Sequence, residues 1–388
     1  MLAPKGFRAA GVACGIKAEG VLDLGLLVND AGSAVAGTFT TNRVCAAPVK
    51  WSRIVTLRGR ARACVVNSGN ANACTGERGK EDAESMARLA GELLRAPAKE
   101  IVVASTGKIG VPLPMDAVAR GIRAAAAELG EGNQYGTKFA RAIMTTDAHV
   151  KESAVRSKAG FCVGGCTKGA GMIAPNMATM LAFITTDAVA SPGLLRQCLS
   201  AAVARSFNRI SVDGHTSTND TVILMASGSS GVEAGERIEL FQAALDKVAH
   251  DLALKIVADG EGATKVVEIE VVGTDTDDEA DRIARAVACS PLVKTALHGA
   301  DPNWGRIISA AGYSWSKLDE TQVSVFLGSK CAFERGLPTG VPRTELAHEL
   351  KGSGCKIRLV VGRGAGTALH WTCDLSKEYV AINAEYFT

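Results

Sequence analysis

Helix-forming and strand-forming segments alternate along almost the whole chain, and this alternation is the strongest constraint on its fold. Apolar residues recur with a helical period in five segments: Glu81–Leu94, Met115–Leu129, Pro192–Arg205, Glu236–Val257 and Asp278–Ala288. Runs rich in β-branched residues predict strands at Ile101–Ala104, Leu181–Thr185, Thr221–Met225, Val266–Val272, Val323–Leu327, Ile357–Val361 and Tyr379–Ile382. Strands interspersed with helices over the full length predict an α/β or α+β fold.

Two patterns within these segments carry further detail. Apolar residues alternate with Glu268 and Glu270 in the strand-like run that begins at Val266, which predicts one buried and one solvated face. Gly362, Gly364 and Gly366 lie between two strand-like runs, and this position favours a hairpin turn over the strand-to-helix turn of a dinucleotide-binding fold. The glycines around Lys168 lack the spacing of a phosphate-binding loop, so we expect no bound nucleotide.

The composition limits the classes of protein to which the chain can belong. Of its 388 residues, 47% are hydrophobic and 21% are charged, which suits one or two globular domains. The net charge is only +3, and no run of Lys and Arg is interleaved with aromatic residues, so no nucleic-acid partner is expected. No stretch approaches the ~18–20 consecutive apolar residues of a membrane span. The first residues hold no apolar secretory segment, and we expect a cytoplasmic protein.

Cysteine and histidine spacing gives no metal site. The eleven cysteines form no C-x-x-C pair, and their odd number fits poorly with a closed disulfide framework, so reduced thiols are the better interpretation. Cys162 and Cys166 lack a second pair at metal-ligand spacing. The six histidines form no H-E-x-x-H motif, and the G-x-S-x-G motif of serine hydrolases is absent as well.

The most unusual segment runs from Lys168 to Thr186. Small residues and a proline precede a sudden apolar run that begins at Met180, which indicates a loop entering a strand at Thr179. On composition alone, Thr179 is best interpreted as the first residue of that strand, since threonine is favoured in strands.

Longer motifs change that interpretation. The stretch G-M-I-A-P-N-M-A-T-M-L, from Gly171 to Leu181, resembles the processing site of the ornithine acetyltransferase family, whose precursors cut themselves before the threonine. Other blocks resemble the same family in the expected order, among them V-N-S-G-N-A-N-A-C-T-G at Val66–Gly76, S-T-G-K-I-G at Ser105–Gly110, D-G-E-G-A-T-K at Asp259–Lys265 and D-P-N-W-G-R at Asp301–Arg306. The chain is therefore identified as a member of this family. The resemblance implies a self-processing α/β sandwich, shared with the β-peptidyl aminopeptidases.

The resemblance also implies a set of processing and site residues. Cleavage between Ala178 and Thr179 would give an α chain of residues 1–178 and a β chain of residues 179–388, with two copies of each commonly assembled. The Thr179 hydroxyl is the implied nucleophile, and its freed α-amino group, with a reference pKa near ~7.7–8.0, would supply the base. Thr106 and Gly107 match the positions of the oxyanion hole. The substrate-binding positions are matched by Thr145, Lys168, Thr179, Glu261, Asn383 and Thr388.

The implied reaction is a ping-pong acetyl transfer in arginine biosynthesis. N-acetylornithine would acetylate Thr179 and leave as ornithine, after which glutamate would take the acetyl group. No metal or organic cofactor is expected, and the sequence leaves open whether acetyl-CoA is a second donor. Three alternatives are a self-processing aminopeptidase, an acetyltransferase of a secondary pathway, and a binding protein that keeps the fold without activity. One position departs from the family pattern, since His215 replaces an acidic residue.

Overall fold

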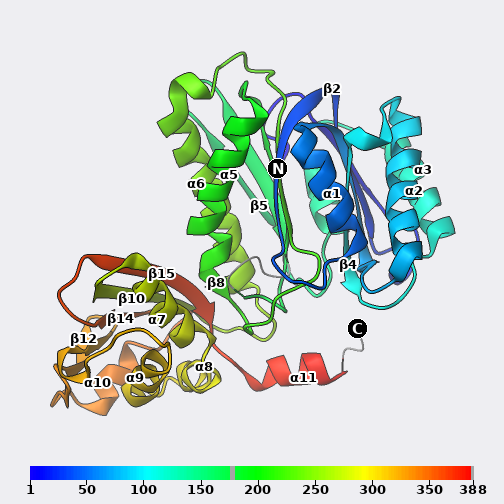
Figure 1. Ribbon diagram of the computed structural model, residues 1–388. Coiled ribbons are helices and arrows are strands. Elements are labelled where there is room, and N and C mark those ends of the chain that lie inside the picture. The colour runs from blue at the N-terminus through cyan, green and yellow to red at the C-terminus, as the bar shows by residue number, and fades with distance from the viewer. Residues whose placement is uncertain (175–179, 386–388) are drawn as a thin grey trace.

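The computed structural model describes residues 1–174 and 180–385, and it contains two β-sheets in one continuous mixed α/β arrangement (Figure 1). The first sheet has the strand order β4-β3-β2-β9-β7-β6-β5, and β1 also pairs with β2. Its strands are β1 (Arg8–Val12), β2 (Leu24–Phe39), β3 (Arg60–Asn70), β4 (Ile101–Lys108), β5 (Lys151–Arg156), β6 (Cys162–Lys168), β7 (Leu181–Thr186) and β9 (Thr221–Ala226).

The first sheet is buried on both faces because helices cover each of them. Ala182 and Ile184 of β7 belong to one apolar core with α5 (Pro192–Arg205) and α6 (Ile238–Ala258). Leu181 and Phe183, which point the opposite way, belong to a second core with α4 (Asn133–Ala142) and α1 (Ala47–Arg58). The outer strands β3 and β4 pack against α2 (Gly76–Leu94) and α3 (Met115–Ala127). A strand buried on both faces needs a continuous apolar run, which β7 has.

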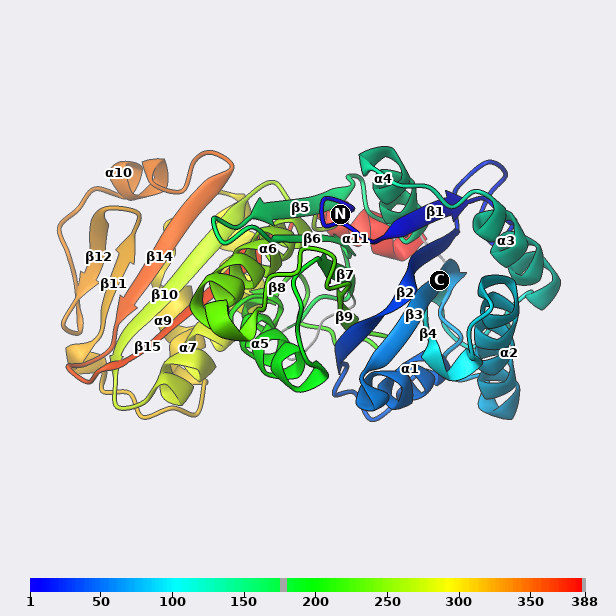
Figure 2. The same ribbon diagram turned by 90° about the horizontal axis from the view of Figure 1, so that it is seen from above.

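The second sheet has the strand order β13-β12-β11-β14-β10-β15-β8 and is built from residues after Thr186. Its strands are β8 (Ile210–Ser211), β10 (Val266–Thr274), β11 (Ser324–Leu327), β12 (Lys330–Glu334), β13 (Leu337–Pro338), β14 (Gly354–Val360) and β15 (Gly366–Cys373). The helices α7 (Asp277–Cys289), α8 (Pro291–His298) and α9 (Trp304–Gly312) pack on one face. Figure 2 shows this sheet and the first one on opposite sides of α5 and α6. The short helix α10 (Arg343–His348) lies near its edge.

The alternation predicted for β10 is confirmed. Val267, Ile269 and Val271 are buried beneath the helices, whereas Glu268 and Glu270 form ion pairs with Lys356 on the other face.

Two sequence-based predictions are wrong. The segment Tyr379–Ile382 is not a strand but part of α11 (Lys377–Glu385), where the Tyr379 N–H donates to Ser376 Oγ at 3.2 Å in the manner of a helix cap. β15, the strand before this segment, already pairs with β10 on one side and with β8 on the other. The segment therefore cannot pair with β15 as an additional strand.

The glycine segment after β14 is not a hairpin turn. β10 lies between β14 and β15, pairing parallel with the first and antiparallel with the second, so the segment crosses the end of β10. A Cβ atom on Gly364 would lie 2.0 Å from the Thr274 carbonyl oxygen. The glycine is therefore needed for close passage over a backbone and not for a tight turn.

The described part of the chain contains no helix long and apolar enough to span a membrane. All eleven cysteines are free thiols.

We expect Phe183→Ala to lower the free energy of unfolding by about 3–5 kcal/mol, because it empties a fully buried site. The Phe183 ring packs edge-to-face on Phe139 with 5.3 Å between ring centroids. Denaturant unfolding measures the change. Leu57→Ala is the control, because the Leu57 side chain is 71% exposed and its loss should change stability by less than about 0.5 kcal/mol. Equal effects of the two substitutions would contradict this assignment of the core.

Candidate active site

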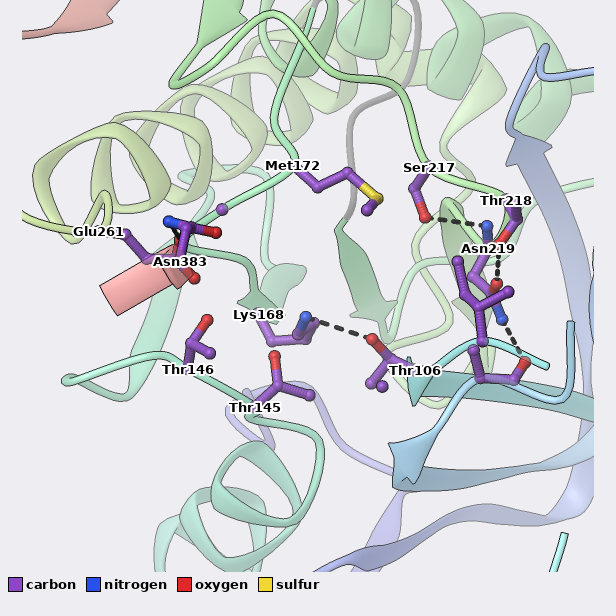
Figure 3. A pocket seen from close by; sticks show the side chains of 14 residues that line it. Thr106, Thr145, Thr146, Lys168, Met172, Ser217, Thr218, Asn219, Glu261 and Asn383 are labelled. Atoms are coloured by element: carbon purple, nitrogen blue, oxygen red, sulfur yellow. Dashed lines mark hydrogen bonds between the residues drawn. The ribbon is translucent and has the colours of Figure 1, made fainter. Parts of the chain in front are cut away.

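A cavity of about 170 Å³ opens where the ends of β4 and β6 meet the loops that follow them. Figure 3 shows Lys168 and Thr106 in the middle of this pocket, with Glu261 and Asn383 toward one side and the segment Ser217–Asn219 toward the other. The complete lining is Ala71, Thr106, Gly107, Ile109, Thr145, Thr146, Lys168, Gly171, Met172, Ser217, Thr218, Asn219, Glu261 and Asn383. Six residues that the sequence analysis selected therefore meet in one pocket: Thr106, Gly107, Thr145, Lys168, Glu261 and Asn383.

Three selected residues lie outside the part of the chain that the structure describes. These are Ala178 and Thr179, at the expected cleavage site, and Thr388 at the end of the chain.

Thr106 and Gly107 lie near the end of β4, where the backbones of β3 and β4 approach closely. The pairing of the two strands shifts register at Gly69 and Asn70. Gly107 has φ of +130°, and a Cβ atom there would lie 2.3 Å from the Gly69 carbonyl carbon. Only glycine fits this backbone, so the geometry of the strand end requires a glycine at position 107.

A buried amide holds this strand end in place. Asn219 Nδ2 donates to the Ala71 carbonyl oxygen at 2.7 Å and to the Ser105 carbonyl oxygen at 2.8 Å. Ser105 Oγ in turn donates to Asn67 Oδ1 at 2.5 Å. Buried polar groups that satisfy each other in this way fix a single arrangement of the backbone. Thr106 is thereby presented to the pocket from a rigid support.

Lys168 is the last residue of β6, and its side chain is almost entirely buried. Its Nζ donates to Thr106 Oγ1 at 3.2 Å, which is its only hydrogen bond to a described residue. Burial lowers the pKa of Lys168, and the neighbouring Asp147 carboxylate opposes this shift. An ammonium group with unused donors that faces a cavity can bind an anionic group of a ligand.

The opposite charge in the pocket is Glu261, just beyond the end of α6. Asn383 Nδ2 donates to Glu261 Oε2 at 2.8 Å, so α11 contributes to the pocket through this amide. A Cβ atom on Gly171 would lie 2.4 Å from the Glu261 carboxylate, and glycine at that position leaves room for it. Lys168 and Glu261 together give the pocket one cationic and one anionic group, which suits an amino acid.

Two aspartates hold the described residues on either side of the expected cleavage site. Asp213 accepts hydrogen bonds from the Met172 N–H at 2.6 Å and the Ile173 N–H at 2.9 Å. Asp220 Oδ1 accepts from the Met180 N–H at 3.0 Å. Burial raises the pKa of Asp220 well above that of an ordinary aspartate, although the Met180 N–H opposes the shift.

Sequence reasoning missed the loop between these aspartates. Ser217, Thr218 and Asn219 line the pocket, and the dense polar run that contains them was the available signal. His215 lies in the same loop, is exposed and does not line the pocket. Among the described residues, no group of three His, Cys, Asp or Glu side chains is arranged to hold a metal ion.

Comparison with known proteins identifies the family. A family model described as the ArgJ family matches residues 8–388. The chain belongs to the ArgJ family. The predicted family, its acetyltransferase class and its α/β fold are thereby confirmed.

Two relatives match the chain over almost its full length, and a crystal structure matches about half of it. An arginine biosynthesis bifunctional protein ArgJ from Rhodopirellula baltica is 45% identical, over 99% of this chain and 96% of the relative. The protein of the same name from Bacillus anthracis is 44% identical, over 100% of this chain and 97% of the relative. A crystal structure of ArgJ from Bacillus halodurans is 42% identical over 52% of this chain and 97% of that chain, with a TM-score of 0.49.

Asp147 lies beside the pocket, and its charge gives the fold a pH dependence. Burial alone would raise the pKa of Asp147, but the ammonium groups of Lys168 and Lys151 and the Gly169 N–H lower it to about 2. Because this pKa lies below its ordinary value of 3.8, Asp147 stabilises the fold above about pH 4, and this contribution is lost as the pH falls toward 2.

We therefore expect the difference in unfolding free energy between the wild type and Asp147→Asn to shrink by about 2 kcal/mol from about pH 5 to about pH 2. Denaturant unfolding at a series of pH values measures this difference. A difference that stays constant over the range would show that the carboxylate is not held in its charged form.

Proposed function

We propose that this protein transfers an acetyl group from N-acetylornithine to glutamate in arginine biosynthesis, through an acetyl-enzyme on Thr179 that forms after self-cleavage between Ala178 and Thr179. The observation that carries the proposal is the convergence of Thr106, Gly107, Lys168 and Glu261 in one pocket. The names of the relatives, arginine biosynthesis bifunctional proteins, support the pathway.

Each pocket residue has a role in this reaction. The Thr106 hydroxyl and the Gly107 N–H stabilise the oxyanion of the tetrahedral intermediate, a contribution typically of about 2.7–4 kcal/mol per donor. Lys168 binds the substrate carboxylate, and Glu261 binds its ammonium group. Asn383, Thr145 and Thr388 complete the binding site. The free α-amino group of Thr179 accepts the proton of the hydroxyl, because an α-amine with a pKa near ~7.7–8.0 is a base at neutral pH.

The ping-pong order follows from the use of one nucleophile. N-acetylornithine gives its acetyl group to the Thr179 oxygen and leaves as ornithine, and the glutamate amine then takes the acetyl group from the ester. A pocket with one cation and one anion favours this reaction over the aminopeptidase alternative. The acetyl-CoA donor, the assembly of two α and two β chains and the cytoplasmic location stay predictions.

Thr179 provides the test of the mechanism. We expect Thr179→Ala to remain one uncut chain without acetyl transfer, whereas Thr179→Ser keeps part of both activities because it retains a nucleophilic oxygen. Mass spectrometry of the purified chains and an assay with N-acetylornithine and glutamate measure both properties. A parallel assay with acetyl-CoA and glutamate decides whether a second donor is used. Full transfer activity in an uncut wild-type chain would contradict the mechanism.

The two fragments should stay associated after cleavage. β6 and β7 lie on opposite sides of the cleavage site and pair with each other, and β2 pairs with β9 in the same way. Residues 1–178 carry 23 basic and 14 acidic side chains, against 20 and 26 in residues 179–388, so the fragments are oppositely charged. We expect them to copurify through gel filtration in about 1 M salt, because buried apolar area rather than exposed charge holds them together. Separation at that salt concentration would contradict the shared sheet.

A further inference from the structure

Lys151, the first residue of β5, is a buried cation beside the pocket but not in its wall. Its side chain is 1% exposed. Its Nζ lies 2.6 Å from Asp147 Oδ1 and 2.5 Å from Asp259 Oδ2, and it also donates to the His149 carbonyl oxygen at 3.3 Å. All three ammonium hydrogens therefore have acceptors.

The two carboxylates that Lys151 joins also bind backbone N–H groups next to the pocket residues. Asp147 accepts from the Gly169 N–H at 2.6 Å and from the Thr145 N–H at 2.9 Å. Asp259 accepts from the Ala148 N–H at 3.1 Å and from the His149 N–H at 3.2 Å.

These contacts join three segments that are distant in the sequence. The first holds Thr145 and Thr146, the second ends at Lys168, and the third leads from α6 into Glu261. A backbone bond from the Glu261 N–H to the Ala170 carbonyl oxygen, at 2.9 Å, closes the connection between the second and third segments.

Lys151 is the ammonium group that pairs directly with both buried carboxylates, Asp147 and Asp259. Lys168 and Lys17 also act on the Asp147 charge, but neither forms an ion pair with it. Without Lys151, Asp259 would lose its ion pair and Asp147 its direct partner, and a buried charge left without its partner is strongly unfavourable. Lys168 would then be drawn toward Asp147 and away from a ligand in the pocket.

We propose that Lys151 is a positioning residue, which fixes the three segments that bind the substrate and neutralises Asp147 so that the Lys168 ammonium remains available to a substrate carboxylate. This inference rests on the proposed function for the identity of the ligand. Thr106 and Gly107 have a separate support in Asn219, so Lys151 acts on binding more than on the chemical step.

Kinetics of Lys151→Met provide the first measurement. Both N-acetylornithine and glutamate carry a carboxylate that Lys168 would bind, so we expect KM to rise on the order of tenfold for both, equivalent to about 1.4 kcal/mol, with a smaller change in kcat. Asp259→Asn keeps an oxygen acceptor for the Ala148 and His149 N–H groups but removes one charge. Lys151 still neutralises Asp147 in this variant, so only the loss of the ion pair that fixes the third segment acts on the pocket. KM should therefore rise by a smaller factor, and the variant serves if Lys151→Met does not fold.

Lys356→Met is the matched control. Lys356 also lies between two carboxylates, 3.0 Å from both Glu268 and Glu270, but on the solvated face of the second sheet. We expect its loss to leave both KM values unchanged.

Hydrogen exchange provides a second measurement that does not need activity. In Lys151→Met the amides of residues 145–149 and 169 should exchange faster, while those of β7 keep their wild-type rates. Unchanged exchange, or unchanged KM values in an active variant, would overturn the inference. Faster exchange in a protein whose wild type transfers no acetyl group would overturn the proposed function instead, and would leave Lys151 only its role in fixing the three segments.

Discussion

The register of three central strands determines where the pocket of this protein forms. Lys168 pairs with Leu181 across β6 and β7, and Leu181 pairs with Thr221 across β7 and β9. A shift by one residue would turn the apolar side chains of β7 to the wrong faces, and both faces are buried, so the register is strongly specified. The last residue of β6 and the first residues of β7 and β9 therefore lie side by side at one end of the strands, and the pocket lies at that end of the sheet.

Strand ends that meet inside the protein bring buried polar groups together, and the hydrogen-bonding needs of these groups are met in two ways. Uncharged groups bind backbone: Asn219 joins the ends of β3 and β4. Charged groups are paired, as in the cluster of Asp147, Lys151 and Asp259. Pairing is necessary because desolvating a lone ion costs several kcal/mol. Two charged groups differ: Asp220 accepts the Met180 N–H without an ion pair, and the Lys168 ammonium has one hydrogen bond to a described residue and faces the cavity. A buried ammonium with unused donors beside a cavity is a candidate for binding an anionic group of a ligand.

Local patterns predicted some regular elements well and missed others, such as α4 and β6. The helix expected at Pro192–Arg205 has the same bounds in the structure, and β7 extends one residue beyond its prediction. β2 was missed because its middle reads N-D-A-G-S, a turn-like run; in the structure its pairing with β3 skips from Val28 to Ser33 while the strand continues. The error at Tyr379–Ile382 has a different cause, since four apolar residues fit either a strand or a helix turn.

Local sequence patterns predicted little of the pocket. Its residues came from the family resemblance, whereas composition alone made Thr179 an ordinary strand residue. The residues that were missed act over long sequence separations, as Asn219 does on Ala71 and Ser105, 148 and 114 residues away. No local pattern encodes such a contact. Asn219, just before β9, lies beside the ends of β3 and β4 because β9 pairs with β2 in the same sheet.

The second sheet contributes to the pocket by returning the end of the chain to it. Among the described residues, none between Glu261 and Asn383 lines the cavity, although the whole of β10–β15 lies in that interval. After β15 the chain enters α11, which Figure 1 shows extending away from the second sheet toward the first. No residue of α11 is fully buried, so side-chain contacts must hold it. The Tyr379 hydroxyl donates to Asp213 Oδ2 at 3.2 Å, and Asp213 also holds Met172 and Ile173. The helix that brings Asn383 to Glu261 is therefore tied to the same aspartate that binds the Met172 and Ile173 backbone, just before the expected cleavage site.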